Sequence, residues 1–314
     1  MKTTTKIYQD LNLLVKSSIE ATRPKQWTKN FLVFAAPLFS FQYDGGIWIA
    51  SFQTLICFCL ISSAIYLIND CLDIKSDRLH PIKKYRAIAS GRLKVTYAII
   101  LALLLSSLSL YLSSLLSSSL TGIIFLYALI QTTYCVRLKH EPLLDLFCIS
   151  SGFLLRAIAG GISSELTISP WFLLTVGLLA LFLALEKRKA ELRNSIKNGI
   201  ITRSVLNRYS LPLLLRLESI VATSSFLTYA LWAAGPSVEG AKTSWMLLTV
   251  PFVLTGIFRY QLLSDPTEAN RRNASQKIET PENPEEILLK DKGIRLTLIG
   301  WILTTIIIGI STHI

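Results

Sequence analysis

Long apolar runs recur along almost the whole chain and constrain its fold more than any other feature. Several of them reach the ~20 residues that an α-helix needs to cross a bilayer. Hydrophobic residues make up 51% of the 314 residues and charged residues only 17%, which excludes an ordinary soluble domain. The sequence therefore predicts an all-α polytopic membrane protein. Residues 1–29 lack the apolar core of a cleavable signal sequence, so we expect the first membrane helix to direct insertion.

Nine segments are expected to form membrane helices, preceded by a more polar segment. We expect residues 1–29 to form an N-terminal cytoplasmic or interfacial segment, because apolar and charged side chains are mixed there in an amphipathic pattern. Residues 30–314 are expected to form a single membrane domain. The expected helices cover residues 30–43, 47–70, 95–114, 118–138, 141–161, 170–187, 209–235, 244–263 and 293–311.

Lys and Arg are distributed very unevenly between the two sides of this predicted topology. With the N-terminus in the cytoplasm, 29 of the 32 Lys and Arg residues fall on the cytoplasmic side. This positive-inside pattern predicts an integral protein of the inner or plasma membrane whose C-terminus lies outside and whose active site is cytoplasmic. It also explains the net charge of +12 without a nucleic-acid partner. The expected cytoplasmic loops cover residues 71–95, 187–208 and 264–292.

Three aspartates follow the second apolar run. Asp70, Asp73 and Asp77 are spaced i, i+3 and i+7, so a continuous helix would carry all three carboxylates on one face. Mg²⁺ compensates such like charges, and it binds carboxylates together with substrate phosphate oxygens. Basic residues that could bind phosphate follow at once. The pattern predicts a diphosphate site at a membrane surface, with basic residues at Lys75, Arg78, Lys83, Lys84, Arg86, Arg92 and Lys94.

Charged residues within or beside two later apolar runs could have either a functional or a structural role. Asp145, Gly152 and Arg156 fall on one stripe of the expected helix 141–161. An acid and an arginine there are costly and commonly functional, although a structural ion pair that fixes helix packing is the alternative. We favour the functional interpretation, because the first acidic cluster could pair with this region. The basic stretch from Glu186 to Arg193 is interpreted as topological, since the positive-inside rule requires basic residues at that helix end.

The aspartate cluster also resembles a known motif. Asn69-Asp70-x-x-Asp73-x-x-x-Asp77 is similar to the first aspartate-rich motif of the UbiA-type intramembrane prenyltransferase superfamily. Segments along nearly the whole chain resemble one branch of it, the decaprenyl-phosphate phosphoribosyltransferases. These segments are Arg23 to Asn30, Asp77 to Pro81, Arg86 to Gly91, Arg137 to His140, Gly152 to Gly161, Ser169 to Phe172, Lys187 to Leu192 and Pro284 to Ile287.

This resemblance implies a fold, a cofactor and a reaction. The implied fold has about nine membrane helices around a central cavity, and the implied cofactor is Mg²⁺. The implied reaction transfers 5-phosphoribose from phosphoribosyl pyrophosphate to a polyprenyl phosphate and releases diphosphate. Its product would serve cell-wall sugar supply.

Individual side chains are expected to take roles in this reaction. Metal binding is assigned to Asp70, Asp73 and Asp77. We expect Lys139, Arg137 and Arg156 to contact donor phosphates. The residues with expected catalytic roles are Asp73, Asp145, Lys139 and Arg156, and those expected to bind substrates are Lys25, Lys29, Asn69, Arg86, Tyr134 and Arg137.

Two alternative functions are considered. Most of the superfamily carries a second Asp-x-x-x-Asp motif, of which Asp145-x-x-x-Ile149 keeps only the first carboxylate. A site with one ligand fewer fits a donor that brings extra phosphate oxygens, and it disfavours transfer of a polyprenyl group from its diphosphate to an aromatic acceptor. A membrane transporter with Asp and Arg along a path is disfavoured, because the charges gather at the inner membrane face.

Overall fold

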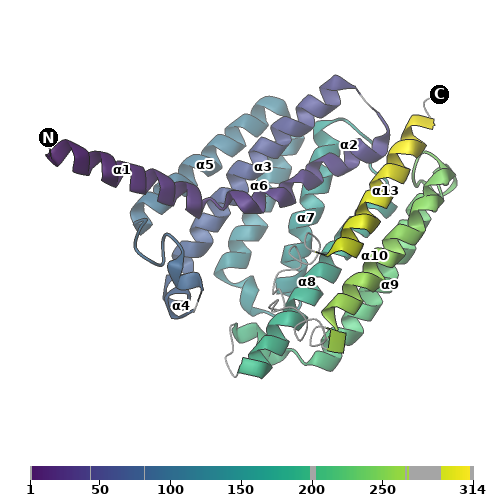
Figure 1. Ribbon diagram of the computed structural model, residues 1–314. Helices are drawn as coiled ribbons and strands as arrows, with labels where there is room; N and C mark the ends of the chain where they lie inside the picture. The colour runs from purple at the N-terminus through teal and green to yellow at the C-terminus, as the bar shows by residue number, and fades with distance from the viewer. Residues whose placement is uncertain are drawn as a thin grey trace. The chain divides into compact units, whose positions relative to one another are not determined.

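The computed structural model describes residues 2–42, 44–80, 82–198, 203–265, 267–268 and 291–311, and within them helices are the only regular secondary structure (Figure 1). The all-α expectation is therefore confirmed for the described chain. The α-helices are α1 (Lys2–Ala21), α2 (Ala35–Ser40), α3 (Gly45–Leu72), α4 (Ile74–Leu79), α5 (Val95–Leu116), α6 (Ser118–Val136), α7 (Leu144–Ser163), α8 (Pro170–Asn198), α9 (Leu211–Ala233), α10 (Val250–Ser264) and α13 (Lys292–Ser311). The 3₁₀-helices are η1 (Pro24–Phe34), η2 (Lys83–Tyr85), η3 (Leu138–His140), η4 (Ser204–Arg208), η5 (Pro236–Val238) and η6 (Ser244–Thr249).

Eight helices of the described chain are long and apolar enough to cross a membrane, one of them made of η6 and α10 together. This number is close to the nine expected. The expected first span, residues 30–43, has a different structure, because η1 is a 3₁₀-helix and α2 has only six residues. Prolines explain part of this difference: Pro24 stands in the first turn of η1, and Pro37 lies inside α2, where it removes a backbone donor.

The sixth expected helix is longer than predicted. It was expected to end at residue 187, yet α8 continues to Asn198, so the expected loop 187–208 is helical over its first half. The reason is that charged side chains of this stretch pair with each other at i,i+3 spacing and are buried. The expected loop 264–292 falls mostly outside the described residues.

The chain divides into two compact units. Unit 1 comprises residues 1–38 and 42–166, and unit 2 comprises residues 39–41 and 167–314. In unit 1, α3 packs against α5, α6, α7 and η1. The core of this packing consists of buried side chains contributed by these elements: Val33, Cys57, Phe58, Ile61, Ile65, Leu120, Ile124, Tyr127, Cys135, Leu155 and Ala159.

Helix η1 is held closely against α3 and α7. A Cβ atom on Gly160 would lie 1.8 Å from the carbonyl oxygen of Val33, so only glycine permits this approach of α7 to η1. The buried Asn30 donates to Ser62 Oγ at 3.2 Å, and Trp27 Nε1 donates to Ser63 Oγ at 3.0 Å. These contacts fix the segment that begins directly after Arg23.

Unit 2 is built on two helix pairs, α8 with α9 and α10 with α13. Aromatic side chains pack between its elements. The Phe39 and Trp232 rings meet edge to face at 5.1 Å, and Phe39 also contacts Trp301 at 5.4 Å. The Trp301 indole donates to the Tyr229 hydroxyl at 2.7 Å, so this aromatic core also satisfies its polar atoms.

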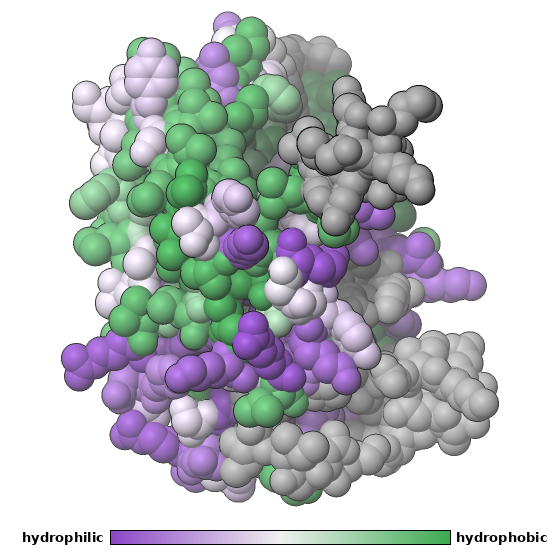
Figure 2. Space-filling model, turned by 90° about the vertical axis from the view of Figure 1, so that its left-hand side faces the viewer, coloured by the Kyte–Doolittle hydropathy of each residue, from purple (hydrophilic) through white to green (hydrophobic). Residues whose placement is uncertain are grey.

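Large apolar side chains cover much of the molecular surface. Figure 2 shows one face on which hydrophobic residues form a broad area, with hydrophilic residues gathered toward the bottom of the view. On α5 the exposed apolar residues include Leu103 and Leu104, at 63% and 62% exposure. Such a surface suits contact with lipid acyl chains and not with water.

Candidate functional site

The predicted aspartate cluster lies where α3 passes into α4. Helix α3 ends at Leu72, and Asp73 stands between the two helices with φ −92° and ψ 7°. The backbone N–H of Asp77 still donates to the Asp73 carbonyl at 2.8 Å. The helix is therefore interrupted at Asp73, so the condition of one continuous helix, under which all three carboxylates would share a face, is not met.

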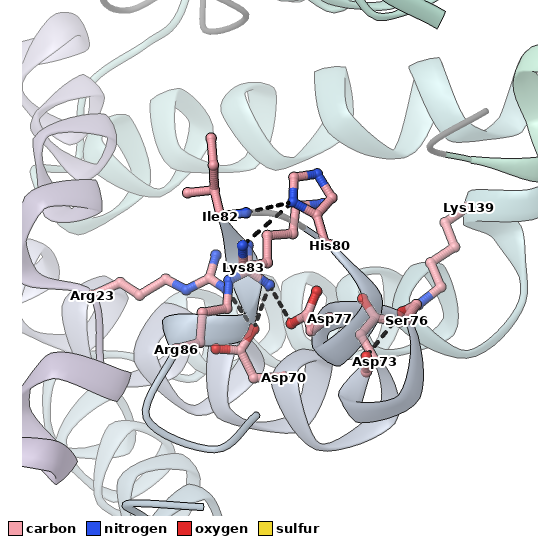
Figure 3. Close-up of polar contacts among 10 residues, drawn as sticks. All are labelled: Arg23, Asp70, Asp73, Ser76, Asp77, His80, Ile82, Lys83, Arg86 and Lys139. Carbon is pink, nitrogen blue, oxygen red and sulfur yellow. Dashed lines mark hydrogen bonds and ion pairs between the residues drawn. The ribbon is translucent and has the colours of Figure 1, made fainter. Parts of the chain in front are cut away.

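The interruption separates the three carboxylates into a pair and a single group. Asp70 and Asp77 are both buried and share a partner, since Arg86 Nη1 lies 3.1 Å from Asp70 Oδ1 and 2.7 Å from Asp77 Oδ2. Arg23 also pairs with Asp70, so two guanidinium groups converge on this carboxylate (Figure 3). Asp73 instead pairs with Lys139. Within the described chain, no three Asp, Glu, His or Cys side chains are grouped closely enough to hold a metal ion together.

The loop after α4 returns Arg86 to the aspartates. His80 Nδ1 accepts hydrogen bonds from the backbone N–H groups of Ile82, at 3.2 Å, and Lys83, at 3.3 Å (Figure 3). Arg78 Nε donates to the Ala89 carbonyl at 3.0 Å, which ties α4 to the far end of the same loop. These bonds close the loop locally, so Arg86 is placed by backbone geometry and not only by its ion pairs.

The same loop is also clamped to α1. Arg92 binds Glu20 through two parallel contacts, of 2.5 and 2.6 Å, and donates to the Tyr85 carbonyl at 2.6 Å. The hydrogen bond from Arg92 lowers the pKa of the Glu20 carboxyl below its usual value, although partial burial acts in the opposite direction. Helix α1 is thereby joined to the loop that carries Arg86.

Arg23 was not among the predicted site residues. It precedes η1 with φ 53° and ψ 61°, a left-handed conformation that costs free energy in a residue other than glycine. Its guanidinium lies 5.0 Å from the Tyr66 ring centre, in cation–π contact. The sequence signal was Arg23-Pro24, because proline fixes the start of η1 directly after a basic residue.

Lys139 lies between α6 and α7 and contacts one of the aspartates at the end of α3. Lys139 lies in η3, and its Nζ is 2.5 Å from Asp73 Oδ1, with the lysine side chain 11% exposed. The first acidic cluster thus pairs with Lys139, just before the helix that carries Asp145 and Arg156, whereas a role of those two residues in the same site stays a prediction. Tyr134 is half-buried at the end of α6, and Arg137 is exposed just before η3.

Arg156 is buried among neutral partners. Its Nε donates to Asn30 Oδ1 at 2.7 Å, its Nη1 to the Gly152 carbonyl at 2.6 Å and its Nη2 to the Tyr127 hydroxyl at 2.9 Å. Rings of Tyr127, Phe58 and Phe153 lie within 6 Å of the guanidinium carbon. The structure therefore gives Arg156 a packing role that joins η1, α6 and α7, and its predicted contact with donor phosphate stays a prediction.

The remaining predicted residues are distributed over unit 1. Asp145 is fully buried in the first turn of α7. Asn69 is half-buried and directly precedes Asp70 near the end of α3. Lys29 is half-buried on η1, whereas Lys25 is exposed there. Their roles in binding substrate or metal remain predictions.

Unit 2 contains a second charged cluster that sequence reasoning missed. Lys189 Nζ lies 2.6 Å from Glu186 Oε1 and also pairs with Glu218 of α9. One turn away, Arg188 and Glu191 pair at 2.5 Å. The topological interpretation of this stretch is therefore wrong in part, because four of its charged side chains are buried. The available signal was Glu218, an acid within an apolar run.

The donor set at Asp70 and Asp77 fits a divalent cation. Both groups are buried carboxylates, the ligand type that Mg²⁺ takes from proteins, usually one or two at a time with substrate phosphates completing the shell. A positive atom, Arg86 Nη1, already lies within hydrogen-bond distance of both. Asp70 and Asp77 would therefore be the ligands, and Asp73 could join them only after leaving Lys139.

Comparison with known proteins identifies relatives along almost the whole chain. The family model of the UbiA prenyltransferase family matches residues 31–279. The decaprenyl-phosphate phosphoribosyltransferase of Mycolicibacterium smegmatis is 37% identical over 302 residues, covering 92% of this chain and 91% of that protein. The protein of the same name from Corynebacterium glutamicum is 35% identical over 300 residues, covering 92% and 85%.

Solved structures show the same fold at low sequence identity. A UbiA homologue from Archaeoglobus fulgidus bound to DMAPP and Mg²⁺ has a TM-score of 0.67 at 16% identity, covering 92% of this chain and 98% of that one. A UbiA homologue from Aeropyrum pernix without ligand has a TM-score of 0.62 at 14% identity, covering 89% and 97%. Sequence and fold agree, and the chain belongs to the UbiA prenyltransferase family.

Proposed function

We propose that the protein is a membrane transferase that moves 5-phosphoribose from phosphoribosyl pyrophosphate to a polyprenyl phosphate and releases diphosphate. The observation that carries this proposal is the 37% identity, over more than nine-tenths of both chains, to a decaprenyl-phosphate phosphoribosyltransferase. The buried carboxylates and convergent guanidinium groups at the end of α3 support it, because they provide ligands for a metal–diphosphate complex. A role in wall-sugar supply would follow from the product.

The reaction needs charge stabilisation more than proton transfer. The C1–O bond to diphosphate breaks, a C1–O bond to the acceptor phosphate forms, and diphosphate leaves with the electron pair. Bound Mg²⁺ would neutralise the leaving diphosphate. Arg86, Arg23 and Lys139 each form an ion pair with at least one of the three aspartates, and these cations would bind phosphate oxygens as negative charge develops. The acceptor phosphate is already an anion, so no general base is required.

The proposed orientation follows from charge. The chain is an integral membrane protein, since it belongs to this family and its described residues include eight apolar helices of spanning length. The excess of Lys and Arg supports a cytoplasmic N-terminus and a cytoplasmic active site. Cysteines introduced as Lys75→Cys and Lys242→Cys, after the five native cysteines are replaced by serine, test this. An impermeant thiol reagent added to intact cells should label only position 242, and labelling only at position 75 would reverse the topology.

A donor test decides between this reaction and the main alternative. Purified protein with Mg²⁺ receives labelled phosphoribosyl pyrophosphate and a polyprenyl phosphate in one reaction, and polyprenyl diphosphate with an aromatic acid in another. We expect label to pass from ribose into the lipid phase and to be lost with a chelator. The alternative draws support from the fold likeness to a UbiA homologue bound to GPP and Mg²⁺. Product only in the second reaction would establish that alternative.

A further inference from the structure

One nitrogen atom of Arg86 lies within hydrogen-bond distance of both buried carboxylates that could hold a cation. Nη1 lies 3.1 Å from Asp70 Oδ1 and 2.7 Å from Asp77 Oδ2, and it is a single positive atom between two buried carboxylates. The side chains of Asp70 and Asp77 are 4% and 5% exposed, whereas that of Arg86 is 27% exposed. The carboxylates are therefore fixed within the protein, while the guanidinium retains access to the outside.

A second guanidinium completes the charge balance. Arg23 pairs with Asp70 on one side and lies over the Tyr66 ring on the other, with its side chain 24% exposed. Two carboxylates and two guanidinium groups leave this group of four residues neutral. A divalent cation that entered alone would add two positive charges beside two guanidinium groups, which Coulomb repulsion opposes in a partly buried site.

A diphosphate changes this balance. Its negative oxygens provide a new partner for guanidinium groups, and bidentate guanidinium–phosphate pairs are strong charge-assisted interactions. Arg86 and Arg23 could therefore leave the carboxylates without losing an anionic partner, and the carboxylates would become available to the metal ion. The transfer of the guanidinium groups to the diphosphate and the binding of the metal ion by the carboxylates are favourable only together.

We propose that Arg86, assisted by Arg23, holds the place of the metal ion in the metal-free protein and moves onto the donor's diphosphate when metal and donor enter together. The inference rests on the proposed function, because it requires a metal–diphosphate substrate. It makes metal and diphosphate binding mutually dependent: each raises the affinity for the other by a common factor, which for coupled sites is typically about 5–150-fold. Metal alone binds weakly.

The test is metal binding without turnover. Full-length protein in detergent is titrated with Mn²⁺, followed by its paramagnetic resonance signal, with and without inorganic pyrophosphate at fixed concentration. For the wild type we expect pyrophosphate to tighten Mn²⁺ binding by at least about tenfold, within the range of coupled sites. Arg86→Gln should bind Mn²⁺ alone at least about fivefold more tightly than the wild type, and pyrophosphate should then add little.

Matched variants separate this exchange from general electrostatics. Lys16→Gln removes one positive charge from an exposed residue of α1 and should leave both Mn²⁺ affinities within about twofold of the wild type. Arg86→Lys keeps the charge and should keep weak binding of Mn²⁺ alone. If Arg86→Gln fails to fold, Arg23→Gln carries the same prediction with a smaller gain.

Either of two results would overturn the inference: Arg86→Gln binding Mn²⁺ alone no more tightly than Lys16→Gln, or pyrophosphate leaving the Mn²⁺ affinity of the wild type unchanged. Failure of the proposed function would look different. In that case coupling to pyrophosphate would persist and depend on Arg86, while label from phosphoribosyl pyrophosphate would not reach the lipid phase.

Discussion

Unit 1 and unit 2 each contain a cluster in which one basic side chain joins two carboxylates, but the two clusters differ in access. In unit 1, Arg86 joins Asp70 and Asp77 while its side chain remains 27% exposed. In unit 2, Lys189 joins Glu186 and Glu218, and all three side chains are at most 5% exposed. Where solvent reaches the cation, as in unit 1, the cation can exchange its carboxylate partners for a ligand. Where solvent does not reach it, as in unit 2, the same charge pattern holds two helices together permanently.

The way each cluster is assembled differs as well. Glu186 and Lys189 are i,i+3 neighbours on α8, and Glu218 adds a contact from α9, so the unit 2 cluster fixes one helix pair. The unit 1 cluster combines the end of α3, α4, the loop before α5 and the residue before η1. Ligands drawn from several short segments can shift separately, which is an advantage for binding and a disadvantage for rigidity.

The largest expected effect is on catalysis and concerns the charged site of unit 1, where Asp73 pairs with Lys139. Asp73→Asn should reduce phosphoribosyl transfer by more than about 100-fold, because a charged group at the diphosphate site is lost. The unfolding temperature should change little, since Asp73 is partly exposed. Initial rates in the donor assay measure the effect. Glu165→Gln, at an exposed residue of unit 1, is the control and should be nearly silent; activity of Asp73→Asn near that of the control would remove Asp73 from the site.

In the unit 2 cluster of Glu186, Lys189 and Glu218, a substitution should lower the stability of the fold. Lys189→Met leaves Glu186 and Glu218 buried beside each other without their cation, a change that typically costs about 3–5 kcal/mol. Thermal unfolding in detergent measures the loss. Lys242→Met, at an exposed lysine of unit 2, should leave the unfolding temperature unchanged. A variant of Lys189 as stable as this control would mean that the cluster does not hold α8 and α9 together.

Arg156 provides an intermediate case, a buried cation with neutral partners. Arg156→Ala leaves Asn30 Oδ1 and the Tyr127 hydroxyl without their donor, and we expect a loss of about 2–3 kcal/mol in the free energy of unfolding. The effect of this substitution on the donor KM, measured on the folded fraction, tests whether Arg156 also contacts the donor phosphate. A raised donor KM would establish the predicted phosphate contact, and an unchanged KM with reduced stability would leave only the packing role.

The smallest expected effect concerns the clamp between Glu20 and Arg92. Because the folded-state pKa of Glu20 is lowered, its contribution to stability is complete above the unfolded-state pKa and is lost as the pH falls through the folded-state value. Both side chains are more than a third exposed, so the contribution should be about 1 kcal/mol or less. The difference in unfolding temperature between the wild type and Glu20→Gln should be present at neutral pH and vanish in acid. A difference that grew in acid would contradict this.

Sequence reasoning was effective where one physical property decides the result. Hydrophobic length located the helices of spanning length, since lipid imposes a nearly fixed requirement on each. The aspartate spacing indicated a region in which buried carboxylates and basic side chains do gather, and Lys139 meets Asp73 there. Hydropathy also indicated that residues 30–43 form a membrane helix, but it could not anticipate the 3₁₀ geometry of η1, because that geometry depends on its packing against α7.

The partners of charged groups were harder to predict. Nothing in the local pattern around Lys189 indicates that Glu218, 29 positions away, completes its pairing, because this depends on which helix packs beside α8. Arg23 was missed for a related reason. Its role depends on a left-handed backbone conformation and on the return of the loop that carries Arg86, and both arise from tertiary contacts.

The close approach of η1 to α7 sets an order of events during biosynthesis. The segment from Pro24 to Phe34 is too short to span a bilayer by itself, and its contacts on α7, Gly160 and Arg156, are translated more than 120 positions later. Until α7 has left the ribosome and entered the membrane, Asn30 can bind Ser62 of α3 but lacks its second partner, Arg156. The contacts of η1 with α3 can thus form first, whereas its close approach to α7 is completed only late in the synthesis of unit 1.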